Sequence, residues 1–81
     1  MERTEFLNLC QKCAKLNEFG QIKQNVPDEL KVKANGCTYY PVGYELAFDE
    51  LGAPVHKAIL HDLQARCVAY FPLDKVVSYD G

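Results

Sequence analysis

The chain has 81 residues, of which 48% are hydrophobic and 25% charged, with five Tyr, four Phe and no Trp. This length fits one small domain with a thin margin of stability, and the composition excludes an intrinsically disordered chain. The formal net charge is −2. Lys and Arg outnumber Asp and Glu six to five over residues 1–35 and are outnumbered three to six over residues 36–81. Neither half therefore carries the basic excess that is typical of nucleic-acid-binding proteins.

The segment MERTEFLNL carries charges at positions 2, 3 and 5 and lacks the apolar stretch of a signal peptide. No run approaches the roughly 18 apolar residues of a membrane span. We therefore expect a cytoplasmic protein without membrane contact, whose four cysteines stay reduced.

Residues 4–19 predict an amphipathic helix. Thr4 is the expected N-cap, and Glu5 lies in the first turn, where the helix dipole favours a negative charge. Gly20 supplies the expected C-terminal stop. The apolar residues recur at the 3–4 spacing of one helix face, namely Phe6, Leu9, Cys10, Cys13 and Leu16.

Residues 29–77 predict a β-rich region. Leu30, Val32 and Ala34 alternate with Lys31 and Lys33, as in a half-buried strand, and a tight-turn pair follows at 35–36.

The next run has the most regular alternation in the chain. One expected face carries Tyr40, Val42, Tyr44, Leu46 and Phe48, and the other carries Tyr39, Pro41, Gly43, Glu45 and Asp49. Pro41 cannot donate a ladder hydrogen bond, so we expect a bulge, a bend or a sheet edge around Pro41 and Gly43.

Residues 55–63 fit either a helix or a strand, and we favour the strand because a small sheet needs neighbours to bury its faces. Residues 67–71 predict another strand, PLDK a turn or 3₁₀ piece, and Val76–Val77 a last short strand. Residues 78–81 are expected to form a frayed tail. The fold class is therefore α+β in one domain, residues 1–81, with an N-terminal helix followed by four or five antiparallel strands. A small SH3-like barrel is one form that such a sheet could take.

Cys10 and Cys13 form a Cys-x-x-Cys pair. A redox pair needs its first thiol at a helix N-terminus, whereas more than a turn of the predicted helix precedes Cys10. Zinc needs two further ligands, and only Cys37 and Cys67 could complete a four-cysteine site. The alternative is that both helical thiols are core residues, which is the reading we favour. We expect no cofactor and no metal, with Cys10, Cys13, Cys37 and Cys67 as the only metal candidates.

His56 and His61 are five residues apart, so a strand places them on opposite faces. Neither they nor Ser78, Thr4 or Thr38 stand in a pattern that marks nucleophilic catalysis, and we expect no catalytic residue. For binding, Lys31 and Lys33 on one strand face with Tyr39 just beyond the turn could hold single-stranded nucleic acid through charge and stacking. With only two lysines and an acidic domain, we do not expect nucleic acid as the main partner.

The stretches NVPDELKV, YYPVGYELAFD, HKAILHDLQA and VAYFPLDKV resemble small uncharacterised proteins carried by phages and prophages of Gram-positive bacteria. The resemblance spans most of the chain, from the first helix to Val77. It implies a phage accessory context and supplies no activity and no site residues.

We therefore expect a non-enzymatic accessory or interaction module that contacts an unidentified protein. The alternatives are a nucleic-acid-binding accessory protein and a small zinc-binding domain. The thin stability also makes a homodimer plausible, because pairing would bury a sheet edge or the outer helix face.

Overall fold

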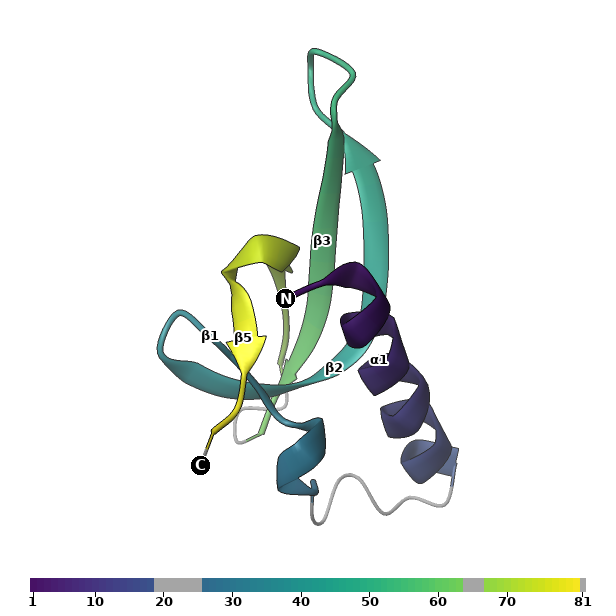
Figure 1. Ribbon diagram of the computed structural model, residues 1–81, viewed down its shortest axis with the longest axis vertical. Coiled ribbons are helices and arrows are strands. Elements are labelled where there is room, and N and C mark those ends of the chain that lie inside the picture. The colour runs from purple at the N-terminus through teal and green to yellow at the C-terminus, as the bar shows by residue number, and fades with distance from the viewer. Residues whose placement is uncertain (19–25, 64–66, 81) are drawn as a thin grey trace.

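The computed structural model describes residues 1–18, 26–63 and 67–80. The elements are α1 (Arg3–Glu18), η1 (Asp28–Leu30), β1 (Val32–Ala34), β2 (Cys37–Phe48), β3 (Pro54–Asp62), β4 (Val68–Pro72), η2 (Leu73–Lys75) and β5 (Val76–Ser78). The five strands form one antiparallel sheet in the order β4-β3-β2-β1-β5, beside which α1 lies (Figure 1). The predicted α+β class is confirmed. The described strands form an open sheet with β4 and β5 at its edges, so the SH3-like barrel does not form.

Helix α1 begins slightly earlier than predicted. The N–H of Phe6 donates to the carbonyl of Glu2 at 3.0 Å, so Thr4 already lies inside the helix and its assignment as N-cap is wrong. Glu5 does lie in the first turn. The predicted apolar face is confirmed, because Phe6 is fully buried and Cys13 is 3% exposed. The expected stop at Gly20 lies outside the described residues.

The β1–β2 hairpin is set by its turn. Asn35 and Gly36 both have positive φ angles, 52° and 78°, and Ala34 pairs with Cys37 across the turn. Positive φ at both central residues is the type I′ pattern, whose twist matches that of the strands. The predicted turn is confirmed, although Leu30 belongs to η1 rather than to the strand.

Strand β2 is interrupted by a bulge. Pro41 pairs with Leu60 and Gly43 with Ile59, which leaves Val42 without a partner in the β3 register. The predicted irregularity is therefore confirmed, and its consequence reaches along the strand. One extra residue reverses the facing of every later side chain, so Tyr44 joins the face of Pro41. The expectation of one face running from Tyr40 to Phe48 is wrong for this reason.

The second half of the chain follows the predicted order. Residues 54–62 are the strand β3, which lies between β2 and β4, so the strand alternative is confirmed. The 3₁₀ turn η2 and the short strand β5 are also as expected. Ser78 pairs with Val32, however, so the sheet includes the first residue of the predicted tail.

The core has two clusters on either side of β2. The larger contains the buried residues Phe6, Val32, Ala34, Tyr39, Ala58, Leu60, Leu73 and Val76. The smaller contains Cys13, Val26, Leu30 and Tyr40. Both clusters use residues from α1 and from the sheet, so the helix is held against β2 by apolar burial.

Residues 45–57, which we call the arm, contribute no buried residue to either cluster. The arm is the distal part of the β2–β3 hairpin and projects beyond α1 and the other strands (Figure 1). It gives the molecule its elongated shape, with principal extents of 42, 26 and 22 Å.

Candidate functional site

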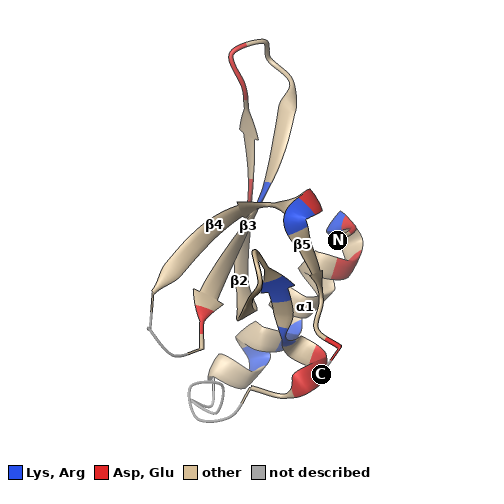
Figure 2. Ribbon diagram, turned by 90° about the vertical axis from the view of Figure 1, so that its left-hand side faces the viewer, with Lys and Arg blue, Asp and Glu red and all other residues tan. Residues whose placement is uncertain are grey.

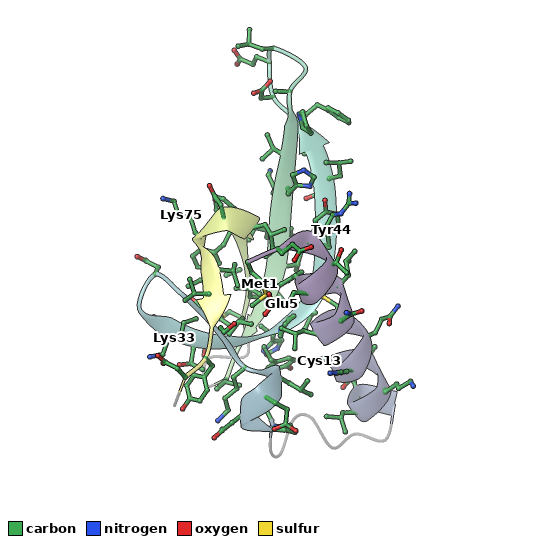
Figure 3. The ribbon with its side chains drawn as sticks, in the orientation of Figure 1. Met1, Glu5, Cys13, Lys33, Tyr44 and Lys75 are labelled. Carbon is green, nitrogen blue, oxygen red and sulfur yellow. The ribbon has the colours of Figure 1, made fainter. Side chains whose placement is uncertain are left out.

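The Cys-x-x-Cys pair lies on the packed side of α1. Cys13 contacts the smaller core cluster and faces the sheet (Figure 3), and Cys10 is half-buried beside the larger one. Burial raises the pKa of both thiols to about 11. A redox or nucleophilic cysteine needs the opposite shift. These two thiols are therefore core groups that stay protonated at neutral pH.

The remaining potential metal ligands do not gather around that pair. Cys37 and Cys67 are exposed, at the start of β2 and just before β4. Among residues 1–18, 26–63 and 67–80, no three His, Cys, Asp or Glu side chains lie close enough to hold a metal ion. The four-cysteine arrangement is thus not brought together in this fold.

The two histidines lie on opposite faces of β3, as expected. His56 shares a hydrogen bond between its Nδ1 and the hydroxyl of Tyr44. The Nδ1 of His61 is hydrogen-bonded to the carbonyl oxygen of Asp62 at 2.7 Å. The His61 ring stacks on the ring of Tyr40, with centroids 5.0 Å apart. Each ring is therefore packed against an aromatic side chain.

The predicted binding group of Lys31, Lys33 and Tyr39 does not come together as expected. Tyr39 is 9% exposed and belongs to the larger core cluster, where its ring lies 5.3 Å from that of Phe71. Lys31 and Lys33 instead hold their Nζ atoms 5.1 and 5.7 Å from the ring centre of Tyr79.

Tyr79 is a residue that the sequence analysis missed, because it lay in the expected frayed tail. The one sequence feature that could have pointed to it is the predicted strand at Val76–Val77, because the pairing of that strand with β1 places Tyr79 near Lys31 and Lys33. Lys31 also forms an ion pair with Asp28 at 2.8 Å.

Charged residues are dispersed over the rest of the fold. Basic positions on α1, on β1 and near η2 are separated by neutral and acidic stretches (Figure 2). The arm differs, because its tip carries Asp49 and Glu50 and no Lys or Arg occurs between residues 34 and 56. The most distinctive charge feature is therefore an acidic tip.

The arm exposes large apolar side chains. Leu46, Phe48 and Leu51 are 46%, 66% and 94% exposed. Because of the bulge, Leu46 and Phe48 lie on the same face of the sheet as Tyr44. Their register partners across the hairpin, His56 and Pro54, lie on that face too. This apolar face continues from the inner face of the sheet, but nothing among the described residues covers it.

The tip itself is a defined turn. The Asp49 carboxylate accepts hydrogen bonds from the N–H groups of Leu51 and Ala53, both at 2.9 Å. Gly52 provides the positive φ of 80° that the turn requires. Leu51 is therefore presented to solvent by a hydrogen-bonded turn.

A cavity of about 550 Å³, which we call the foot groove, lies between residues 54–56 of the arm, η2 and the start of α1. Its walls include Arg3, Pro54, His56, Leu73 and Asp74, and it joins the apolar face of the arm through Pro54 and His56. Another cavity, of about 250 Å³, lies between α1 and β2.

The sequence matches no protein-family model, and no curated protein or solved structure matches it significantly. None of the helices described is long and apolar enough to cross a membrane.

Proposed function

We propose that this chain is a non-enzymatic interaction module that binds another protein through the arm and the foot groove. The observation that carries the proposal is the exposure of Leu46, Phe48 and Leu51 on a hairpin that projects from the body. Contiguous exposed apolar surface on a small soluble domain marks an interaction site.

The energetics of the arm point the same way. A two-stranded ribbon is marginally stable in water by itself. Beyond the Lys57–Pro72 pair with β4 and the His56–Tyr44 hydrogen bond, this one is held by cross-strand pairs and its tip turn. A partner that covers Phe48 would bury apolar area at about 25 cal/mol per Å². Aromatic side chains in such positions often dominate binding energy.

The chemistry of the surface defines the class of partner. The arm offers an apolar face, and its tip offers the carboxylates of Asp49 and Glu50. A matching protein surface would be apolar with basic side chains at its border, because opposite charges steer association and fix orientation. We place this activity in the cytoplasm and in the phage accessory context that the resemblance implies.

The experiment compares capture by three forms of the chain from lysate of the source cells. The forms are the wild type, Phe48→Ser and Val77→Ser, whose targets are similarly exposed at 66% and 55%. We expect at least one protein to be retained by the wild type and by Val77→Ser and lost with Phe48→Ser. That protein, once purified, should bind with an affinity at least tenfold weaker for Phe48→Ser in calorimetry. Identical retention by all three forms would contradict the proposal.

A second candidate function is the binding of single-stranded nucleic acid, favoured by the two lysines that flank the ring of Tyr79. Stacking and charge act together in such sites. The test is fluorescence anisotropy of a labelled oligothymidylate with the wild type and with a Lys31→Gln/Lys33→Gln variant. Salt-sensitive binding that the variant loses would support this candidate, and no binding at 50 mM salt would remove it.

A further inference from the structure

The edge strand β4 has hydrogen-bonding groups that no described strand uses. The N–H of Asp62 donates to the carbonyl of Cys67 at 2.9 Å, which directs the backbone of Cys67 toward β3. Successive residues of a strand point their N–H and C=O groups to alternate sides, so Ala69 and Phe71 also hydrogen-bond to β3. Val68 and Tyr70 therefore turn their N–H and C=O groups to the open side of the sheet.

Strand β4 lacks the features that usually protect an edge. Natural edges are guarded by charged side chains, internal proline or bulges. The strand reads VAYFP, has no charged residue, and has its proline only at the last position. Val68 and Tyr70 are 51% and 60% exposed.

The opposite edge differs. Strand β5 has three residues, and the hydroxyl of Ser78 donates to the carboxylate of Glu5 on α1 at 3.5 Å. A charged helix side chain thus lies beside that edge. Neither edge strand has a charged residue of its own, but β4 is the longer, and the structure shows no charged helix side chain hydrogen-bonded to it among the described residues.

We infer that β4 pairs with β4 of a second copy of this chain, antiparallel and centred on Ala69. In this register Val68 of each copy lies opposite Tyr70 of the other. Both residues have a donor and an acceptor, so the two pairs form four backbone hydrogen bonds and leave none of these groups unused. A register centred on Tyr70 would place Val68 opposite Pro72, which has no N–H. The carbonyl of Val68 would then remain unpaired.

The side chains are compatible with this pairing. A twofold axis normal to the sheet keeps the same face of both copies on the same side. Tyr70, which is opposite Ile59 in the β3 register, therefore meets Val68 of the second copy in an apolar contact on one face of the joined sheet. No charged side chain of β4 is brought opposite another, so the strand is its own complement.

The small area buried between the two β4 strands limits the affinity of the dimer. Five residues of strand span about 17 Å, which gives less contact than the roughly 800 Å² per partner of a standard interface. We therefore expect a weak dimer with a dissociation constant on the order of 100 µM.

The test is sedimentation equilibrium of the full chain from 5 µM to 1 mM. The weight-average mass of the wild type should rise from the monomer value of 9.2 kDa toward twice that value. Tyr70→Lys should weaken association at least tenfold, and Val77→Lys on the other edge should leave it unchanged. Phe48→Ser should also leave it unchanged, which separates this pairing from binding through the arm.

Amide hydrogen exchange reads out the register directly. The amides of Val68 and Tyr70 should become protected as the concentration rises, whereas those of Ala69 and Phe71 should be protected at every concentration. A monomer at 1 mM would overturn the inference. A dimer that Val77→Lys disrupts, or in which the amides of Val68 and Tyr70 exchange independently of concentration, would overturn it equally.

Discussion

Cys10 and Cys13 show how position on a helix decides what a thiol can do. Their spacing is that of redox and metal pairs, but both follow more than a turn of α1 and point into packed apolar surroundings. Burial disfavours the charged thiolate and raises the pKa of each to about 11. The same spacing that looks reactive in the sequence thus produces two inert core groups.

Alkylation should distinguish these thiols from an exposed one. At pH 8 a thiol with a pKa of about 11 is about one part in a thousand thiolate. We expect iodoacetamide to modify Cys37 in the native protein while Cys13 remains unmodified, with the positions read by peptide mass spectrometry. Adding 8 M urea is the control and should make Cys13 reactive. Native labelling of Cys13 as fast as Cys37 would contradict its burial.

Alkaline pH should destabilise the fold. The pKa of Cys13 is about 11 in the folded chain against 9.0 for the ordinary thiol, so its stabilising effect is complete below pH 9 and is lost as pH rises through 11. The loss is on the order of 2 kcal/mol. Burial also raises the pKa of Tyr40, which acts in the same direction.

Urea unfolding at pH 8, 9.5 and 10.5 measures this effect on the free energy of unfolding. Cys13→Ala is the matched variant, because it removes the titrating group from the same site. Its stability should fall less steeply with pH than that of the wild type. Equal slopes for the two proteins would mean that Cys13 does not carry the effect.

The β1–β2 hairpin shows at the element scale how a turn fixes strand pairing. Gly36 has a φ of 78° and no atom within 4 Å of the position of an added Cβ, so only backbone strain opposes a side chain there. Gly36→Ala should therefore lower the free energy of unfolding by about 1 kcal/mol. Asn35→Gly, which keeps the positive φ accessible, is the control. A neutral result for Gly36→Ala would mean that the turn adopts another conformation.

The elements with local signals could be predicted from the sequence. The apolar face of α1 and the Asn35–Gly36 turn depend on residues close together in the sequence. The β3 strand was favoured because strands were predicted on both sides of it. The bulge was foreseen from Pro41, but which residue would be left unpaired was not. That choice depends on the register against Leu60 and Ile59, and it decides which face Phe48 joins.

The candidate site was harder to predict for the same physical reason. Alternation over β2 indicated a half-buried strand, yet burial also needs an opposing layer, and none of the described elements covers the arm. The contact of Lys31 and Lys33 with Tyr79 depends on β5 returning beside β1. Neither the missing layer nor this long-range contact has a local sequence pattern.

At the scale of the whole molecule, the fold divides into a packed body and an arm. None of residues 45–57 is buried, so the body should not need the arm for its stability. The arm in turn extends a sheet whose core already ends at Tyr44 and Ala58. A segment that adds exposed apolar area without adding core is what the proposed binding of a partner through the arm would require.

Shortening the arm tests this division. Ala47 and Val55 face each other across the hairpin and, like Asp49 and Ala53 beyond them, belong to its hydrogen-bonded pairs. Residues 48–54 can therefore be replaced by Asn-Gly, the two-residue turn that closes on such a pair. Because no core residue is removed, we expect the shortened chain to keep its fold, with a midpoint of thermal unfolding within about 5 °C of the wild type. Circular dichroism and amide exchange measure this, with the buried amide of Leu60 as the internal reference. The same chain should lose the protein partner that Val77→Ser retains. Unfolding on shortening would show that the arm stabilises the body, and retained binding would move the interaction site to another surface.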